Sequence, residues 1–166
     1  KLINYKFFHN HHTLNLAWQL FERGTLNSER LGENLRFSIF REIAEAGINV
    51  VTTHCYSSDF ISRTGLTDPK YMKKVESIIE KNGGRAFFVH LIADEKEILK
   101  RVSGGSRKNY RKLRDKKILK EYLNKNNWKT VAPVKNNLQI DNTHLSPKKV
   151  ANIIIKHFKL KPSWSQ

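Results

Sequence analysis

The chain has 166 residues, of which 31 are Lys or Arg and 15 are Asp or Glu, so its formal net charge is +16 at pH 7. This length suits one domain with one hydrophobic core. Hydrophobic residues make up 39% of the sequence, yet no apolar run approaches the ~20 residues of a membrane-spanning helix. We therefore expect no membrane partner.

The single cysteine, Cys55, excludes an internal disulfide framework and is compatible with a reducing, cytoplasmic location. We expect its side chain to be buried as a small hydrophobic group.

The positive charge has two interpretations. A polyanionic partner such as a nucleic acid would account for it. A Lys- and Asn-rich composition, combined with a site for phosphorylated ligands, would account for it as well. The basic residues are spread over most of the expected helices, and only residues 100–120 form a dense cluster. This distribution favours the second interpretation.

Short apolar runs alternate with amphipathic segments along the first half of the chain. The pattern predicts a helical tail over residues 1–4, strands over 5–9 and 48–56, helices over 13–21 and 31–46, and a loop over 24–30. Gly47 is in the position of a helix-ending glycine.

The second half repeats this alternation. A helix begins at Asp68-Pro69, with proline at its first position. The strand over residues 86–93 leads to Asp94 and Glu97, whose spacing predicts a capping box for a short helix. After a Ser-Gly-Gly break, the pattern predicts a basic flap, a helix over 115–124, a strand over 138–141 and a helix that begins at 146–147.

The order of elements predicts the fold class. Strands that alternate with helices form βαβ crossovers and hence a parallel sheet. We expect an α/β fold in which residues 1–160 form one three-layer domain, with helices on both faces of a parallel sheet. Residues 161–166 would be a flexible tail.

Four segments, taken in order, resemble P-loop kinase-like small-molecule phosphotransferases, and in particular their AAA or shikimate-kinase-like branch. This broad group holds shikimate kinase, adenylate kinase and chloramphenicol phosphotransferase. The segments are YKFFHNHHTLNL, INVVTTHCY, LIADEKEILKRV with SRKNYRKL, and LQIDNTHLSPKKVANIII. The resemblance implies a P-loop NTPase fold and an ATP-dependent kinase that uses Mg²⁺. Its phosphate acceptor would be a small hydroxylated or phosphorylated metabolite.

The sequence departs from that family in one respect, because it contains no GxxxxGK[ST] loop. Members of the family begin with a strand, this loop and a helix, which supply the phosphate cradle, a lysine and the hydroxyl for Mg²⁺. We therefore expect the first βα unit to be missing from residues 1–166 by truncation. This part alone would be inactive and would bind neither ATP nor Mg²⁺ tightly.

The resemblance also implies a lid over residues 103–115. Arg107, Arg111 and Lys112 are its candidate catalytic cations, because phosphoryl transfer needs positive charge near the phosphate oxygens. The alternative is a solvated basic surface.

A nucleotide-side group comprises Arg101, Asp141 and Thr143. The resemblance places Arg101, at the end of the helix before the lid, and the turn after the last strand beside the nucleotide. For Asp141 and Thr143 the alternative is an ordinary turn before a capped helix.

His9, Asn10 and His11 follow the first strand, and His54 ends the second. Ligands collect at the carboxyl ends of parallel strands, so these four residues are candidate substrate contacts. An ordinary polar strand end is the alternative. Clustered histidines also suggest a metal, but ligands from one loop cannot easily surround one, and we predict no metal site.

Two other function classes remain open. One is a basic nucleic-acid-binding module. The other is a non-catalytic relative that lacks the P-loop and acts through protein interactions.

Overall fold

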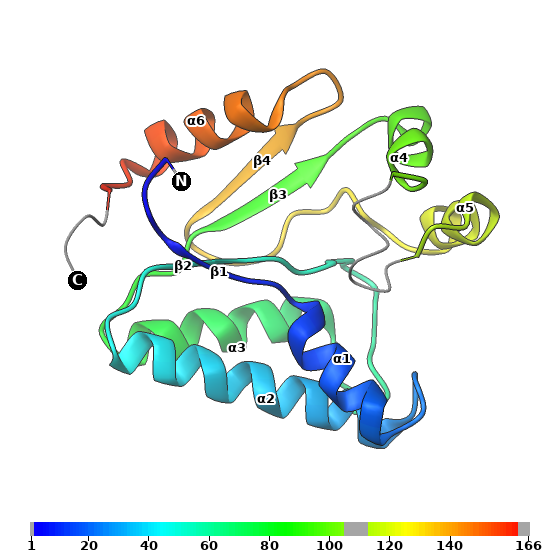
Figure 1. The fold of residues 1–166 in the computed structure, drawn as a ribbon, viewed down its shortest axis with the longest axis horizontal. Coiled ribbons are helices and arrows are strands. Elements are labelled where there is room, and N and C mark those ends of the chain that lie inside the picture. Colours follow the sequence, from blue (N-terminus) through cyan, green and yellow to red (C-terminus); the bar gives the residue numbers. More distant parts are fainter. Residues whose placement is uncertain (1, 105–112, 163–166) are drawn as a thin grey trace.

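The computed structural model describes residues 2–104 and 113–162, which form alternating strands and helices in the expected order (Figure 1). The elements are β1 (Lys6–Phe8), α1 (His11–Leu20), α2 (Leu26–Glu45), β2 (Val50–Thr52), α3 (Asp68–Lys81), β3 (Phe88–Ile92), α4 (Glu95–Arg101), α5 (Lys116–Lys125), β4 (Asn137–Asp141) and α6 (Pro147–Phe158).

Side-chain caps set the beginning of several helices. Thr25 caps α2 by accepting a hydrogen bond from the Ser28 amide, so α2 begins five residues before the expected position. The loop predicted over 24–30 is therefore correct at residues 24–25 and wrong over 26–30. Thr67 and Asp115 cap α3 and α5 in the same way. Residues 2–4 form no helix, which corrects the prediction for that segment.

The predicted capping box at α4 is also wrong. Asp94 is in the N-cap position, but its side chain makes no capping hydrogen bond. Glu97 instead accepts a hydrogen bond from Nε of Arg101, one turn later on the same helix, at 2.8 Å. The carboxylate is therefore used within the helix rather than at its start.

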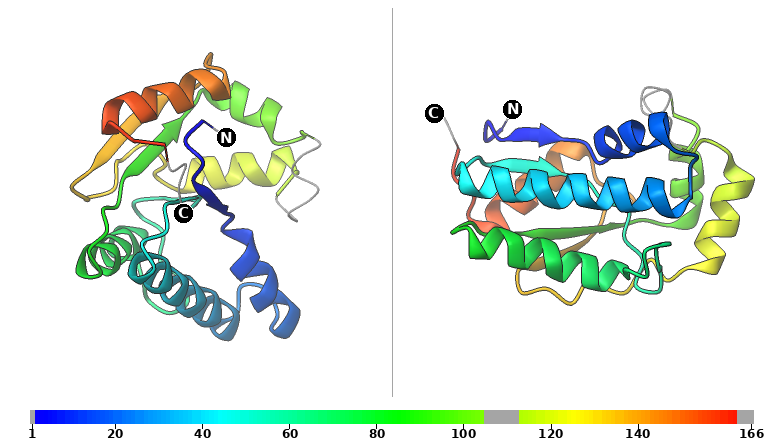
Figure 2. Two further views of the ribbon diagram at one scale, coloured as in Figure 1. Left: turned by 60° about the vertical axis from the view of Figure 1, so that its left-hand side comes forward. Right: turned by 90° about the horizontal axis from the view of Figure 1, so that it is seen from below.

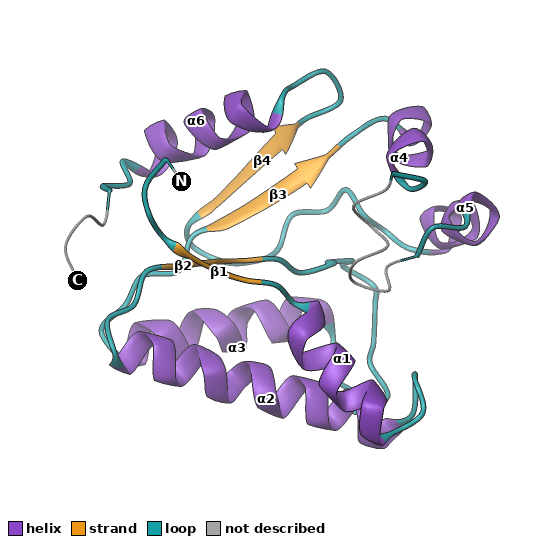
Figure 3. Ribbon diagram, viewed as in Figure 1, coloured by secondary structure: helices purple, strands orange, loops and turns teal. Residues whose placement is uncertain are grey.

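The strands pair in parallel, as expected, but within the described residues they form two separate sheets. β1 pairs with β2, and β3 pairs with β4, while no backbone pairing joins β2 to β3 (Figure 3). A single continuous sheet is therefore not formed within these residues. We call the break between β2 and β3 the gap; in this part of the chain each of these two strands is paired on one edge only.

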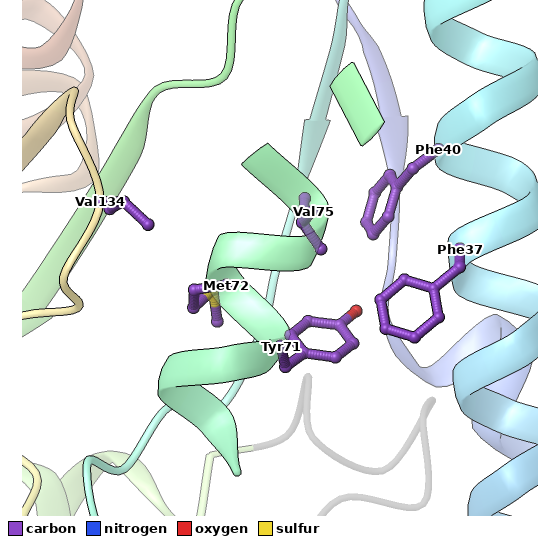
Figure 4. Packing of buried hydrophobic residues seen from close by; sticks show 6 residues of the cluster. All are labelled: Phe37, Phe40, Tyr71, Met72, Val75 and Val134. Atoms are coloured by element: carbon purple, nitrogen blue, oxygen red, sulfur yellow. The ribbon is translucent and has the colours of Figure 1, made fainter. Parts of the chain in front are cut away.

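Helices cover the two sheets unequally (Figures 1 and 2). The core lies under α2 and α3, where Phe37, Phe40, Tyr71, Met72 and Val75 pack together with Val134 (Figure 4). Phe88 of β3 packs against this cluster. On the other face of the second sheet, α6 contributes Phe158, whose ring lies 4.8 Å from that of Phe87.

The face of the first sheet that points away from α2 is open. Phe8 packs edge-on against Phe40, so its neighbour Phe7 points to the opposite face. Phe7 and its register partner Val51 are 60% and 47% exposed. Leu91 of β3 is exposed as well, at 48%. Exposed apolar side chains therefore lie on strands of both sheets.

Cys55 is exposed, contrary to the expectation that it is buried, because it lies in the irregular segment after β2. Among the helices of the described residues, none combines the length and the apolar character that crossing a membrane would need.

Candidate functional site

Polar side chains gather where the strands end. The strands point toward the side of the molecule that holds α4, α5 and the start of α1 (Figure 1). His9 and Asn10 follow β1, and His54 follows β2 by two residues. Because ligands of open α/β proteins bind at this edge, it is the candidate functional site.

Arg36 of α2 is a buried cation at this edge, with only 9% of its surface exposed. Its Nη1 donates a hydrogen bond to Oδ1 of Asn10 at 2.8 Å, and its Nε donates to the carbonyl of Gly32 at 3.1 Å. No carboxylate of the described residues forms an ion pair with it. The Asn10 contact ties the start of α1 to the middle of α2.

Tyr71, in the first turn of α3, contacts both Arg36 and His54. The imidazole of His54 stacks on the phenol ring, with centroids 4.6 Å apart, and the guanidinium carbon of Arg36 lies 5.2 Å from the ring centroid. Burial raises the pKa of Tyr71 to about 12, and the charge of Arg36 offsets part of that shift. The phenol is therefore neutral at physiological pH.

The buried carboxylate of Asp68 orients His54. Its Oδ1 lies 3.2 Å from Nε2 of His54, and its Oδ2 accepts the Ser57 amide at 2.8 Å. Because a carboxylate accepts hydrogen bonds, a neutral imidazole in this position presents Nε2–H to Asp68 and holds its lone pair on Nδ1. Nδ1 is buried and has no hydrogen-bond partner within the described part of the chain. It could accept a proton or a hydrogen bond from a ligand hydroxyl.

His9 and His11 shape the turn between β1 and α1. His9 is buried, at 4% exposure, and its Nδ1 accepts a hydrogen bond from the His11 amide at 3.0 Å. The His11 ring meets Trp18 edge-on. Within residues 2–104 and 113–162, no group of His, Cys, Asp or Glu has the arrangement of a metal site.

Arg101 fastens the loop after β4 to α4. Its Nη1 donates to Oδ1 of Asn142, and its Nη2 donates to the carbonyls of Asn142 and Thr143, all at 3.0 Å. With the Glu97 contact, three of its nitrogens are engaged by the protein. The arginine fixes this loop in position.

Asp141 and Thr143 form a turn that also reaches α4. The Thr143 hydroxyl donates to Oδ1 of Asp141 at 2.6 Å and accepts the Asp94 amide at 2.9 Å. Hydrogen bonds from the hydroxyl and the amide of Thr143 lower the pKa of Asp141. These contacts form a turn between β4 and α6, and nucleotide contact by Asp141 and Thr143 stays a prediction.

A second link joins the segment after β2 to the end of α5. Both carboxylate oxygens of Asp59 accept the Asn127 amide, at 2.9 and 3.1 Å. The Ser57 hydroxyl donates to Oδ1 of Asp59 at 2.5 Å, and its oxygen lies 3.2 Å from the Asn127 carbonyl oxygen. The Ser57 hydroxyl, followed by the Asn127 amide, lowers the pKa of Asp59. We call these three residues the Asp59 clasp.

The expected site residues fall into four groups. His9 and His11 contact each other in the turn between β1 and α1. Asn10 and His54 meet the Arg36 and Tyr71 side chains, whereas Arg101, Asp141 and Thr143 form a separate cluster at the ends of β3 and β4. The lid cations lie outside the described residues; they are Arg107, Arg111 and Lys112.

Sequence reasoning missed Arg36, Tyr71 and Asp68. Arg36 lies on a four-residue row of α2 with Ser28 and Gly32, which are both buried. Small residues along such a row leave room for one long side chain, and this was the signal that could have identified Arg36.

The fold resembles that of a crystal structure described as a "putative kinase" from Chloroflexus aurantiacus J-10-fl. The TM-score is 0.58 at 10% sequence identity, over 93% of this chain and 82% of that one. No protein-family model matches the sequence, and no curated protein matches it either. The likeness shows that the two proteins share a mixed α/β fold.

Proposed function

We propose that residues 1–166 are the acceptor and lid portion of an ATP-dependent P-loop kinase that phosphorylates a small hydroxylated or phosphorylated metabolite. The observation that carries this proposal is the gap between two parallel sheets whose carboxyl ends form one polar edge. The kinase-like fold supports it. A cytoplasmic location is part of the proposal.

In this proposal, one additional parallel strand pairs with both β2 and β3. β2 and β3 each have an unpaired edge, and such edges are normally paired or covered. A strand between them would join the pairs into a continuous sheet with helices on both faces. A helix following that strand would cover Phe7 and Val51, which are exposed apolar groups on the open face.

The described residues do not by themselves fit Mg·ATP. They contain no glycine-rich phosphate loop and no acidic metal-binding group. The proposal therefore assigns the triphosphate and Mg²⁺ to a strand–loop–helix unit outside residues 1–166. The lid cations and the group of Arg101, Asp141 and Thr143 would flank the nucleotide. His54 and Asn10 would face the acceptor.

Calorimetry tests this assignment. Residues 1–166 alone are expected to bind Mg·ATP no better than millimolar, whereas a polypeptide extended by a GxxxxGK[ST] unit should bind it at micromolar concentration. Micromolar binding by residues 1–166 alone would contradict the missing-cradle assignment. An extended protein that folds but binds no nucleotide would contradict the kinase proposal.

The net charge of +16 favours a second candidate, a nucleic-acid-binding module. RNA or DNA binding that weakens steeply with salt and ignores Mg·ATP would support it. The same test distinguishes a non-catalytic interaction protein from both, because such a protein would bind neither nucleic acid nor Mg·ATP.

A further inference from the structure

Two polar atoms in the segment after β2 are buried and have no hydrogen-bond partner among the described residues. They are Nδ1 of His54 and the phenol oxygen of Tyr56. A buried polar group without a partner is costly, because it loses its hydrogen bonds to water and gains none within the protein. Two such atoms within three residues therefore need an explanation.

The two side chains lie on the same side of the chain. Residues 53–57 form neither a turn nor a bend, so the chain continues nearly straight from β2, and residues two positions apart share a side. The His54 ring stacks on Tyr71 of α3, and the Tyr56 ring packs against the core cluster that includes Tyr71. Asp68 is a neighbour of both, because it contacts Nε2 of His54 and its charge acts on Tyr56.

Contacts with neighbouring side chains hold both rings but do not engage these two atoms. Asp68 and Tyr71 fix the imidazole of His54, as described above. The Tyr56 ring meets the His90 ring of β3 edge-on, with centroids 5.9 Å apart. The His54 side chain is 20% exposed and Tyr56 is also only partly buried, so the two atoms lie close beneath the surface.

The two atoms have opposite hydrogen-bonding roles. Nδ1 of a neutral His54 accepts a hydrogen bond. Burial, followed by the charge of Asp68, raises the pKa of Tyr56, so the phenol keeps its proton at physiological pH and donates. A hydroxyl group both donates and accepts, which matches the pair. A carboxylate has no proton for Nδ1, and an ammonium group cannot accept from the phenol.

We infer that His54 and Tyr56 form a binding site for one hydroxyl group of a small ligand, which donates to Nδ1 of His54 and accepts from the phenol of Tyr56. The pair follows the carboxyl end of β2, where ligands of open α/β proteins bind. Because both atoms are covered, the ligand displaces a neighbouring side chain as it enters.

In the proposed kinase, this hydroxyl group belongs to the acceptor molecule, and the pair selects hydroxylated acceptors over their deoxy analogues. An analogue without the hydroxyl would leave both buried atoms unpaired in the complex, which disfavours it. This role in acceptor choice rests on the proposed function. The hydroxyl site itself does not.

Stability measurements test whether the phenol oxygen of Tyr56 is free of structural hydrogen bonds. Tyr56→Phe removes only this oxygen, so urea unfolding should give a free energy of unfolding equal to or above that of the wild type. A less stable Tyr56→Phe would show that the oxygen supports the fold and would overturn the site. Tyr122→Phe, at an exposed tyrosine of α5, is the matched control and should be neutral.

The binding test uses the full-length polypeptide that contains residues 1–166. Methanol is the smallest hydroxylated probe, and acetonitrile is a probe of similar size without a hydroxyl group. The nitrogen NMR signal of His54 Nδ1 should shift with methanol and not with acetonitrile. Tyr56→Phe should weaken methanol binding on the order of 3- to 10-fold, the effect of one hydrogen bond, whereas Tyr122→Phe should bind as the wild type does. No shift with methanol, or an equal shift with acetonitrile, would overturn the site.

The kinase proposal fails independently. Methanol binding that depends on Tyr56 in a full-length protein that binds no Mg·ATP would retain the hydroxyl site and reject the kinase. Phosphoryl transfer with an unchanged KM for the acceptor in both Tyr56→Phe and His54→Phe would retain the kinase and reject the role of the pair in acceptor choice.

Discussion

The imidazole of His54 lies nearly parallel to the phenol ring of Tyr71, at an angle of 15°. This contact joins the segment after β2 to the first turn of α3 in the candidate site. Asp68 contacts Nε2 of the same imidazole, so the orientation of the stacked ring is fixed by both neighbours.

Replacing Tyr71 with Phe should change how stability depends on pH. The folded-state pKa of about 12 lies above the ordinary value of 10.0, so the contribution of Tyr71 is fully present below pH 10. It is lost as the pH rises from 10 toward 12, at up to about 1.4 kcal/mol per pH unit. Urea unfolding measures the free energy of unfolding between pH 9 and 11.5, and this free energy should fall less steeply with pH in Tyr71→Phe than in the wild type. Equal pH dependence in the two proteins would contradict the burial of the phenol.

The Asp59 clasp should protect the Asn127 amide from exchange. Asp59→Ala is expected to raise the hydrogen-exchange rate at Asn127, with Asp94→Ala as a control whose side chain makes no capping bond. The pKa of Asp59 is lowered, so the clasp should persist above pH 3.8 and be lost as the pH falls through the folded value. Unchanged protection of Asn127 in Asp59→Ala would show that other contacts hold the segment.

The two aspartates that precede α4 and α5 should differ in their energetic effect. Asp115 accepts the amides of Lys117 and Ile118, whereas the Asp94 side chain caps nothing. Asp115→Ala should lower the free energy of unfolding by about 1 kcal/mol, and Asp94→Ala by less than half of that. Chemical denaturation of both variants measures the difference, and equal losses would contradict the assigned caps.

The proposed extra strand and helix predict a context-dependent effect at Val51. In residues 1–166 alone, Val51→Lys should change stability by less than about 0.5 kcal/mol, because the side chain is already half exposed. In a polypeptide with the completing unit, the loss should exceed about 1.5 kcal/mol, since a buried valine is lost. Leu20→Lys, at an exposed position of α1, should be mild in both. A small loss of stability from Val51→Lys in both polypeptides would contradict the proposal that a helix covers the open face.

A proposed catalytic cation lies at Arg107, outside the described residues. In the complete protein, Arg107→Ala should lower turnover by about 10²- to 10³-fold with little loss of ATP affinity, because its charge would act mainly on the transferring phosphoryl group. Lys108→Ala is the control and should have a mild effect, because we expect a neighbouring position on the flap to face water. Equal effects in steady-state kinetics would indicate a diffuse basic surface and favour nucleic-acid binding.

Periodicity predicted the order and type of the elements because strands and helices here carry strong local signals. The caps at Thr67 and Ser146 are encoded within a few residues, and α3 and α6 begin where expected. The start of α2 was missed because the Thr25 cap lies among polar residues without an apolar pattern. Local sequence determines helix ends only where the capping residue can be recognised.

The candidate site was less predictable, because it depends on which face of a helix is buried. On α2, Arg36 and Phe40 are buried, whereas the apolar Leu35 and Ile39 beside them are only partly buried. Asn10 and His54 were found because strand ends can be read from the sequence. Their contacts to Arg36 and Tyr71 join residues 17 or more positions apart, which only packing determines.

The unpaired edges of β2 and β3 have a consequence for self-association. A strand edge with free N–H and C=O groups can pair with the same edge of another molecule. The β3 edge has five residues and carries the exposed Leu91, whereas β2 has only three. Of these two edges, that of β3 is the more prone to self-association, and a segment that paired with both edges would block this route to aggregation as well as join the sheets.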